Sequence, residues 1–453
     1  MSRYLIVFFF LASTVAGAQN TIEGNISGFD GKMIYLASIY GEKIKTIDSA
    51  SPDGSGNFRF LISNRLPGMY RVKWEKDGWV DLIWNQENVK FTTSSQFPDD
   101  SLRIISSVEN AINQAYLRLD RLNQAKLQVL IPVVDFYPVK DAFFSAAAME
   151  MENIQMKQQK YLDSLAAIYP RSFAVRMAKV YQAPFITASL LKEDRVLFLK
   201  QHYFDRVDFS DTSLLRSMVF VNKAIAYLSI YSNNRLPQKQ LEAEFIKAVT
   251  LMLGAASVNP VIYKFWLDYL VGGFDKYHFD EVITYIADNF QDPSSCEDQE
   301  RKSSLQKKLD TFKKLAIGKV APDLEVPDLK RKPFKLSSIN AEYTLVVFYA
   351  TTCPHCMTMA PRLKELYEKQ QPKKYEVMFV SIDTSFADWS SFIRDTKLKW
   401  INVSDLKGFN GKSADDYNIY ATPTMFLLDR EKKILAKPIS LMELEQALRD
   451  YNL

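Results

Sequence analysis

The chain has 453 residues, enough for two or three domains that each bury a hydrophobic core. Its composition, 47% hydrophobic and 24% charged, excludes an intrinsically disordered protein. The formal net charge is only +4 and acidic and basic residues are interspersed, so no nucleic-acid partner is expected.

Residues 1–18 have the pattern of a cleaved export signal. Arg3 precedes an apolar run over residues 4–15, and the small residues Ala-Gly-Ala follow at 16–18. A run of about a dozen apolar residues is too short for a membrane-spanning helix, which needs about 20. We therefore expect a signal peptide over residues 1–18 and a mature protein in the periplasm or cell envelope. An uncleaved N-terminal anchor is the alternative.

Residues 19–98 are expected to form a β-rich module. Short runs with alternating polarity are separated by turn residues such as Gly28 and the pair Asp53-Gly54. The expected strands span residues 21–26, 33–38, 44–48, 57–62, 68–74, 79–84 and 88–91. Many short strands at this spacing predict a small antiparallel β sandwich-like module or an open barrel. It contains no candidate catalytic cluster.

Residues 99–316 have helical periodicity almost throughout and predict a central all-α domain. Apolar residues recur at helical spacing, as in Val108, Ile112 and Tyr116, and such stripes are typical of a packed core. Breaks between helices are expected at Pro132, Pro138, Pro170, Pro184, Asn259-Pro260 and Gly272-Gly273.

The strongest chemical signal is the sequence Cys353-Pro354-His355-Cys356. The preceding residues 343–349 are apolar, β-branched and aromatic, as in a buried strand. From Cys356 onward apolar residues recur at helical spacing, so Cys353 should lie at a helix N-terminus. There the free N–H groups and the helix dipole lower a cysteine pKa from about 8.5 to roughly 3.5–7.5. We interpret the two cysteines as a redox-active dithiol that needs no other cofactor.

Two other uses of a CxxC sequence compete with this interpretation. A zinc site would need two more ligands, and outside the motif the chain offers only Cys296, His202 and His278, each isolated. A pair of inert buried thiols is the second alternative. The strand-to-helix position favours redox chemistry, and no metal is expected. Cys296 is interpreted as having no redox role, with a resolving or regulatory thiol or an intermolecular bridge as alternatives.

Strands and helices alternate over residues 317–453, which predicts an α/β domain. After the helix that follows the motif, the expected strands span residues 376–382, 400–403, 424–429 and 432–436, and the expected helices span 386–396, 412–417 and 440–451. Pro423 lies at the entry to the strand expected over residues 424–429. A sheet tolerates proline at the first residue of a strand or at an edge.

This order of elements resembles the thioredoxin superfamily, whose members pair a CxxC helix with a cis-proline loop. Pro423 matches the cis-proline, and Pro361 matches the proline that kinks the active-site helix. The long gap between the motif and Pro423, with residues 318–323 and 400–405, resembles the secreted TlpA/ResA-like branch, to which AhpC/TSA-type redoxins are related. The resemblance covers residues 318–453. The two upstream modules resemble the multidomain thioredoxin-like proteins of Bacteroidetes.

The resemblance implies that Cys353 attacks a partner disulfide and that Cys356 resolves the mixed disulfide. Thr422 and Pro423 would line the groove for the partner's backbone, and His355 would stabilise the thiolate. The implied partners are protein thiols and disulfides of the cell envelope and an upstream membrane electron donor or acceptor. Cytochrome c maturation and envelope redox homeostasis are the implied processes.

Two residues depart from the family pattern. Val347 stands where thioredoxins carry a buried acid, and Met359 stands where ResA-like proteins carry a glutamate. The Pro-His dipeptide between the cysteines is that of strongly oxidising DsbA-like enzymes. The direction of electron transfer therefore stays open. The alternatives in function are a thiol peroxidase and a cell-envelope binding protein whose N-terminal domains select the partner.

Overall fold

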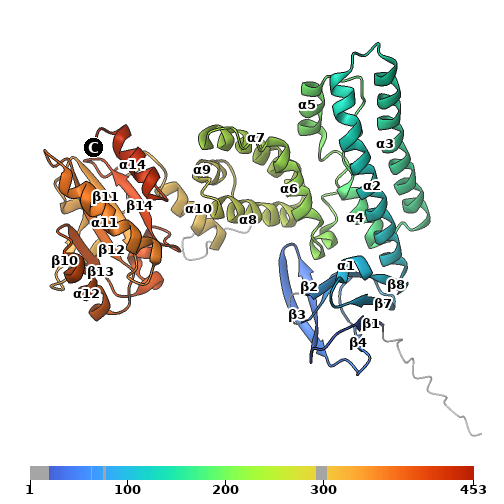
Figure 1. Cartoon of the computed structure of the whole chain (residues 1–453), viewed down its shortest axis with the longest axis horizontal. Coiled ribbons are helices and arrows are strands. Elements are labelled where there is room, and N and C mark those ends of the chain that lie inside the picture. The colour runs from blue at the N-terminus through green and yellow to red at the C-terminus, as the bar shows by residue number, and fades with distance from the viewer. Residues whose placement is uncertain (1–19, 63, 75–77, 292–303) are drawn as a thin grey trace, which may run out of the picture. The chain divides into compact units, whose positions relative to one another are not determined.

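The computed structural model describes residues 20–62, 64–74, 78–291 and 304–453. The expected signal peptide and Cys296 lie outside these ranges. The chain forms two compact units, which are described separately. The first contains the described residues up to Ser232 together with Thr250–Trp266, and the second contains Asn233–Val249 and Leu267–Leu453. The helices and strands carry the labels of Figure 1.

The first unit begins with two four-stranded sheets. Their strands are β1 (Thr21–Ser27), β2 (Ile34–Tyr40), β3 (Lys43–Ala50), β4 (Asn57–Leu61), β5 (Gly68–Trp74), β6 (Gly78–Trp84), β7 (Val89–Ser94) and β8 (Arg103–Ser106). The strand orders are β4-β1-β7-β8 and β3-β2-β5-β6. Side chains from both sheets, among them Ile22, Phe60, Val72 and Leu82, form one buried hydrophobic cluster.

The expectation of purely antiparallel pairing was wrong at β1 and β7. These two strands pair in parallel, with Ile22 opposite Val89. Parallel neighbours need a long crossover connection. Here the chain leaves β1, forms the second sheet and β4, and returns as β7 in the direction of β1.

Helices follow in the first unit. They are α1 (Pro98–Ser101), α2 (Val108–Phe136), α3 (Ala142–Ile168), α4 (Phe173–Tyr181), α5 (Lys192–His202), the 3-10 helix η1 (Thr212–Arg216) and α6 (Val219–Tyr231). The expected break at Pro132 was wrong, because α2 continues to Phe136. Proline removes one hydrogen bond near the end of the helix. Beyond it, Val134 is buried against Phe144 and Ala147 of α3, and this packing favours the continued helix.

A buried carboxylate, that of Glu109 in α2, holds the start of α4. It accepts the backbone N–H groups of Phe173 at 3.0 Å and Ala174 at 2.8 Å, and the hydroxyl of Ser172 at 2.7 Å. The side-chain amide of Asn85 donates a fourth bond at 2.6 Å. Since the first N–H groups of a helix have no partner within the helix, Glu109 satisfies donors that would otherwise be buried unpaired.

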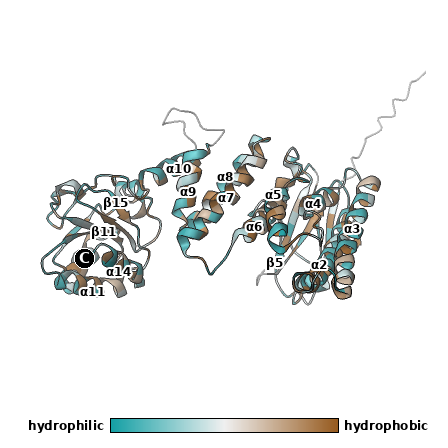
Figure 2. Cartoon of the chain, turned by 90° about the horizontal axis from the view of Figure 1, so that it is seen from above, coloured by the Kyte–Doolittle hydropathy of each residue, from teal (hydrophilic) through white to brown (hydrophobic). Residues whose placement is uncertain are grey.

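The second unit contains residues of four helices: α7 (Gln238–Ala256), α8 (Pro260–Lys276), α9 (Asp280–Asn289) and α10 (Ser304–Lys314). The expected break at Gly272-Gly273 was wrong, because α8 runs through both glycines. The neighbouring Val271 and Phe274 are buried, which offsets a glycine cost of about 1 kcal/mol each. Helix α10 is mostly hydrophilic (teal in Figure 2). Among the described helices, none combines the length and apolar character needed to cross a membrane.

The rest of the second unit is an α/β domain. Its elements are β9 (Glu325–Pro327), β10 (Pro333–Lys335), η3 (Leu336–Ser338), β11 (Tyr343–Tyr349), α11 (Pro354–Lys369), β12 (Tyr375–Ser381), α12 (Phe386–Thr396), β13 (Ile401–Ser404), η4 (Gly408–Asn410), α13 (Lys412–Asp416), β14 (Thr424–Leu428), β15 (Ile434–Ala436) and α14 (Leu441–Asp450). The expected strands and helices are all present. The β9-β10 hairpin was not predicted.

The five-stranded sheet of this domain has the order β13-β12-β11-β14-β15. Strands β11, β12 and β13 run in parallel, and β14 is antiparallel to β11. Alternate residues of β11 enter different hydrophobic clusters: Val347 and Tyr349 belong to one, and Val346 and Phe348 to the other. Because β14 is antiparallel to β11, the start of β14 lies beside the end of β11, where the cysteine motif begins.

Candidate active site

Cys353 is the N-cap residue of α11, and Pro354 is the first residue of the helix. The backbone N–H of Cys356 donates to Cys353 Sγ at 3.3 Å. The thiol of Cys353 donates a second hydrogen bond, to the backbone carbonyl oxygen of Thr422 at 3.2 Å. Cys353 is partly exposed, whereas Cys356 is buried, and both thiols are free. One sulfur is thus accessible to a partner and the other is shielded.

The two thiols differ in acidity. Burial acts to raise the pKa of Cys353, but hydrogen bonds with the Cys356 thiol, with the side chain of Thr422 and with the N–H groups of Cys356 and His355 outweigh it, so the pKa lies below its usual value. Burial, followed by the hydrogen bond to Cys353, raises the pKa of Cys356. The shared hydrogen bond therefore favours a Cys353 thiolate beside a protonated Cys356.

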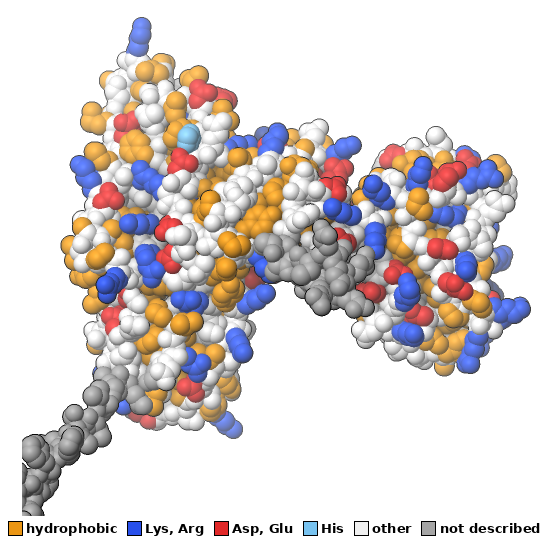
Figure 3. All heavy atoms as spheres, turned by 180° about the vertical axis from the view of Figure 1, so that it is seen from behind, with side chains coloured by type: hydrophobic (Ala, Val, Ile, Leu, Met, Phe, Trp, Pro, Cys, Tyr) orange, Lys and Arg blue, Asp and Glu red, His pale blue; other side chains and the backbone are white. Residues whose placement is uncertain are grey.

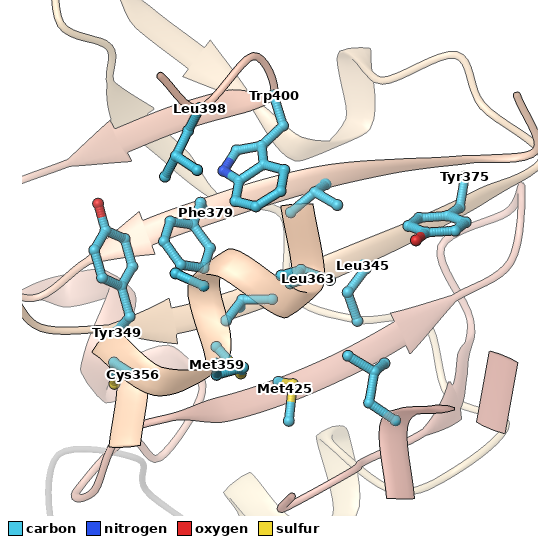
Figure 4. Packing of buried hydrophobic residues seen from close by; sticks show 14 of the residues in the cluster. Leu345, Tyr349, Cys356, Met359, Leu363, Tyr375, Phe379, Leu398, Trp400 and Met425 are labelled. Atoms are coloured by element: carbon cyan, nitrogen blue, oxygen red, sulfur yellow. The ribbon is translucent and has the colours of Figure 1, made fainter. Parts of the chain in front are cut away.

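The surroundings of Cys356 are apolar. Figure 4 shows Cys356 at the start of α11 with Met359, Tyr349 and Leu363 in the same cluster. Val347 is fully buried and Met359 is 4% exposed. The two positions at which the sequence departs from the family's acidic residues thus hold packed apolar side chains, which explains why burial dominates the acidity of Cys356.

The loop that faces the motif contains Thr422 and Pro423, whose peptide bond is cis. It leads into β14, where Thr424 pairs with Phe348 of β11. The structure therefore brings together Cys353, Cys356, Thr422 and the adjoining proline, which are far apart in sequence. The side chains of Pro354 and His355 are exposed beside them. The backbone N–H of His355 is among the groups that lower the pKa of Cys353.

Sequence reasoning missed the residues that support this turn. The buried carboxylate of Asp383 accepts the backbone N–H of Thr351 at 2.9 Å and its hydroxyl at 2.8 Å. The hydroxyl of Ser381 donates to the same carboxylate at 2.7 Å. Asp383 thereby fixes the loop that leads to Cys353. One signal in the sequence could have identified Asp383: it directly follows the predicted strand 376–382. Because parallel strands end at the same edge of a sheet, a residue at that position lies near the end of β11, where the motif begins.

The difference in acidity predicts selective alkylation of the reduced protein. The rate for Cys353 should rise with pH and level off below the pH at which an ordinary cysteine, with a pKa of about 8.5, is half deprotonated. Cys356 should stay unmodified over this range. The measurement is the pH profile of iodoacetamide modification, with the site identified by mass spectrometry. The variant Cys356→Ala, which lacks the thiol donor, should shift the midpoint upward. A native midpoint equal to that of the urea-unfolded protein would contradict the predicted stabilisation.

A cavity of about 690 Å³ borders the motif within the second unit. Its lining includes His355 and Thr358 of α11 and the loop residues Tyr420, Thr422 and Pro423. Residues of α7, α8 and α9 also line it, and so does His278. The accessible side of the dithiol therefore adjoins a cavity of the size that holds small ligands or short peptide segments.

Comparison with known proteins identifies the domain that carries this site. The AhpC/TSA family model matches residues 317–437. The thiol-disulfide oxidoreductase ResA of Bacillus cereus is 31% identical over 133 residues, which are 29% of this chain and 75% of that relative. ResA of Geobacillus kaustophilus is 26% identical over 137 residues, 30% of this chain and 77% of the relative.

A solved structure, the thioredoxin domain of a thiol-disulfide oxidoreductase from Bacteroides vulgatus, is 30% identical and covers 30% of this chain and 98% of its own, with a TM-score of 0.29. The assignment rests on the sequence relatives. Because the chain is 31% identical to ResA of Bacillus cereus over 75% of that relative's length, it belongs to the TlpA/ResA-like branch of the thioredoxin superfamily and is a thiol-disulfide oxidoreductase.

Proposed function

We propose that the protein exchanges electrons with protein disulfides and thiols through Cys353 and Cys356. The observation that supports this most is the placement of Cys353 Sγ. It is partly exposed, it accepts an N–H bond at the start of α11, and it lies 3.2 Å from the carbonyl oxygen of Thr422. A nucleophilic sulfur with a lowered pKa beside a buried second thiol is the arrangement that disulfide exchange requires.

In the reducing direction, the Cys353 thiolate attacks one sulfur of a partner disulfide. The partner's S–S bond breaks, a mixed disulfide forms at Cys353, and the other partner sulfur leaves as a thiolate. Cys356 then attacks Cys353 Sγ, and its proton goes to the departing partner sulfur. The partner sulfur released in the first step takes its proton from water, so the partner gains two electrons and two protons as a dithiol, and Cys353 and Cys356 become a disulfide. Oxidation of a partner dithiol is the reverse sequence.

Thr422 and Pro423 are proposed to hold the partner's backbone during these steps. The carbonyl of Thr422 already accepts a hydrogen bond from Cys353, so it faces the reacting sulfur. Pro354 fixes the first turn of α11, because its φ angle suits that position and it has no N–H to satisfy. The side chain of His355 is proposed to add partial positive charge next to the thiolate. No metal or other cofactor enters the mechanism.

The proposed partners are protein thiols and disulfides of the cell envelope, with an upstream membrane electron donor or acceptor. The proposed processes are cytochrome c maturation or envelope redox homeostasis. Support comes from the TlpA/ResA-like family and from the export-signal pattern of residues 1–18, which suggests a mature protein in the periplasm or cell envelope.

The experiment that tests the function is redox titration of the full mature chain against glutathione buffers. The fraction of disulfide-linked Cys353 and Cys356 should follow a two-electron curve. A potential near about −270 mV would make the protein a reductase, and one near about −120 mV would make it an oxidase. Failure of the two cysteines to form a disulfide at any potential would refute the proposal. Peroxide consumption by the reduced protein without disulfide exchange would establish the thiol peroxidase instead.

A further inference from the structure

The cavity beside the dithiol has two walls. The first is the active-site wall, made by His355 and Thr358 of α11 and by loop residues 420–424. The second wall, here called the helical wall, consists of Gln238 and Glu242 of α7, Asp275 of α8, His278, and Asp280 and Glu281 of α9. Every lining residue belongs to the second compact unit.

Two side-chain contacts attach the helical wall to the active-site region. The hydroxyl of Tyr420 donates to Asp275 Oδ1 at 3.0 Å, two residues before Thr422. Lys437, which follows β15, donates to Asp280 Oδ2 at 2.6 Å. A second cation, Lys308 of α10, pairs with the other oxygen of Asp275 at 2.5 Å. The helical wall is thus anchored to the loop that faces Cys353.

The cavity lining carries an excess of carboxylates. Glu242, Asp275, Asp280, Glu281 and Glu443 line it together with a single lysine, Lys437. On the face of the protein shown in Figure 3, acidic and basic side chains are interspersed instead. The charge of the cavity is therefore a local property and does not follow from the composition of the chain, whose net charge is +4.

The carboxylates differ in whether they are neutralised. Asp275 and Asp280 are paired with lysines. Glu281 and Glu443 are exposed, and the described residues show no ion pair for either. Glu242 is 4% exposed and accepts the backbone N–H of Glu281 at 3.2 Å. Burial, opposed by that hydrogen bond, raises the pKa of Glu242 to about 7. A cation close to this carboxyl group would lower its pKa again and favour the charged, deprotonated form.

We propose that the helical wall selects the partner, and that the segment bound in the cavity is an extended stretch of partner polypeptide with Lys or Arg next to its disulfide. The inference rests on the proposed disulfide exchange. The partner's backbone lies along Thr422 and Pro423, and its cationic side chains meet Glu281, Glu242 and Glu443. Charge complementarity of this kind raises association rates and excludes partners of like charge.

The test compares two disulfide-containing peptides of equal length, one with lysines and one with glutamates beside the cysteine, and a neutral small disulfide, bis(2-hydroxyethyl) disulfide. With the reduced full chain at low ionic strength, kcat/KM for the lysine peptide should exceed that for the glutamate peptide about tenfold or more. Because exposed charges are screened over about 3 Å in 1 M salt, the ratio should approach one there.

The variant Glu281→Gln should reduce the lysine-to-glutamate ratio about three- to fivefold, since one unpaired charge is removed. Glu431→Gln removes the same charge from an exposed turn between β14 and β15, outside the cavity, and should keep the wild-type ratio. Equal rates for the two peptides, with turnover of the neutral disulfide, would overturn the selectivity and leave disulfide exchange intact. No turnover of any of the three would overturn the proposed function itself.

Discussion

Replacing Cys353 with serine should lower the rate of insulin disulfide reduction by about three orders of magnitude or more. A serine hydroxyl is not ionised at neutral pH, and one N–H donor at the start of α11 cannot stabilise it as an alkoxide. Cys356 cannot take over, because it is fully buried and burial raises its pKa. The measurement is insulin reduction with dithiothreitol as electron donor. Wild-type activity in Cys353→Ser would contradict the assignment of the nucleophile.

The matched control is Cys356→Ser, which keeps the nucleophile and removes the resolving thiol. The first exchange step should still occur, so the variant should accumulate a mixed disulfide between Cys353 and its partner. Non-reducing electrophoresis and mass spectrometry would detect this adduct in Cys356→Ser and not in the double variant that carries both Cys353→Ser and Cys356→Ser. Far-UV circular dichroism of each variant checks that the loss of turnover does not reflect unfolding.

Replacing Glu109 with alanine should destabilise the first unit by about 3–5 kcal/mol. The carboxylate is 6% exposed and accepts four hydrogen bonds, two of them from the backbone N–H groups of Phe173 and Ala174. Alanine leaves these donors buried without a partner and opens a cavity between α2 and α4. The readout is urea unfolding of the full chain, with hydrogen exchange of α4 peptides to locate the loss.

Two controls separate the capping role from a general effect of mutation. Glu109→Gln keeps the size and one acceptor oxygen but loses the charge, so its cost should be intermediate, about 1.5–3 kcal/mol. Glu150→Ala, on the exposed face of α3, should change stability by less than about 0.5 kcal/mol. Equal destabilisation by Glu109→Ala and Glu150→Ala would show that the hydrogen bonds of the Glu109 carboxylate do not stabilise the first unit.

Much of the C-terminal domain could be predicted from the sequence because its signals are local. The helix expected over residues 386–396 is α12 with the same ends, and the strand 343–349 is β11. Hydrophobic periodicity and the position of the cysteines depend on neighbours a few residues away. The same reasoning failed at Pro132, at Gly272-Gly273 and for the pairing of β1 with β7, because packing against distant elements decides whether a helix continues and which strands become neighbours.

The chemistry can be predicted from local sequence alone: a CxxC dithiol at a strand-to-helix junction, with Cys353 at the helix start and Pro423 immediately before a later strand. The surroundings of the dithiol depend instead on long-range contacts. The Cys353 thiol forms a hydrogen bond with the carbonyl of Thr422, which is 69 residues away in the sequence, and Tyr420 forms one with Asp275, which is 145 residues away. Such contacts depend on the order of strands in the sheet and on which helices pack beside the loop. A local pattern fixes which thiol can become reactive, whereas the long-range packing fixes its acidity and the carboxylates that adjoin it.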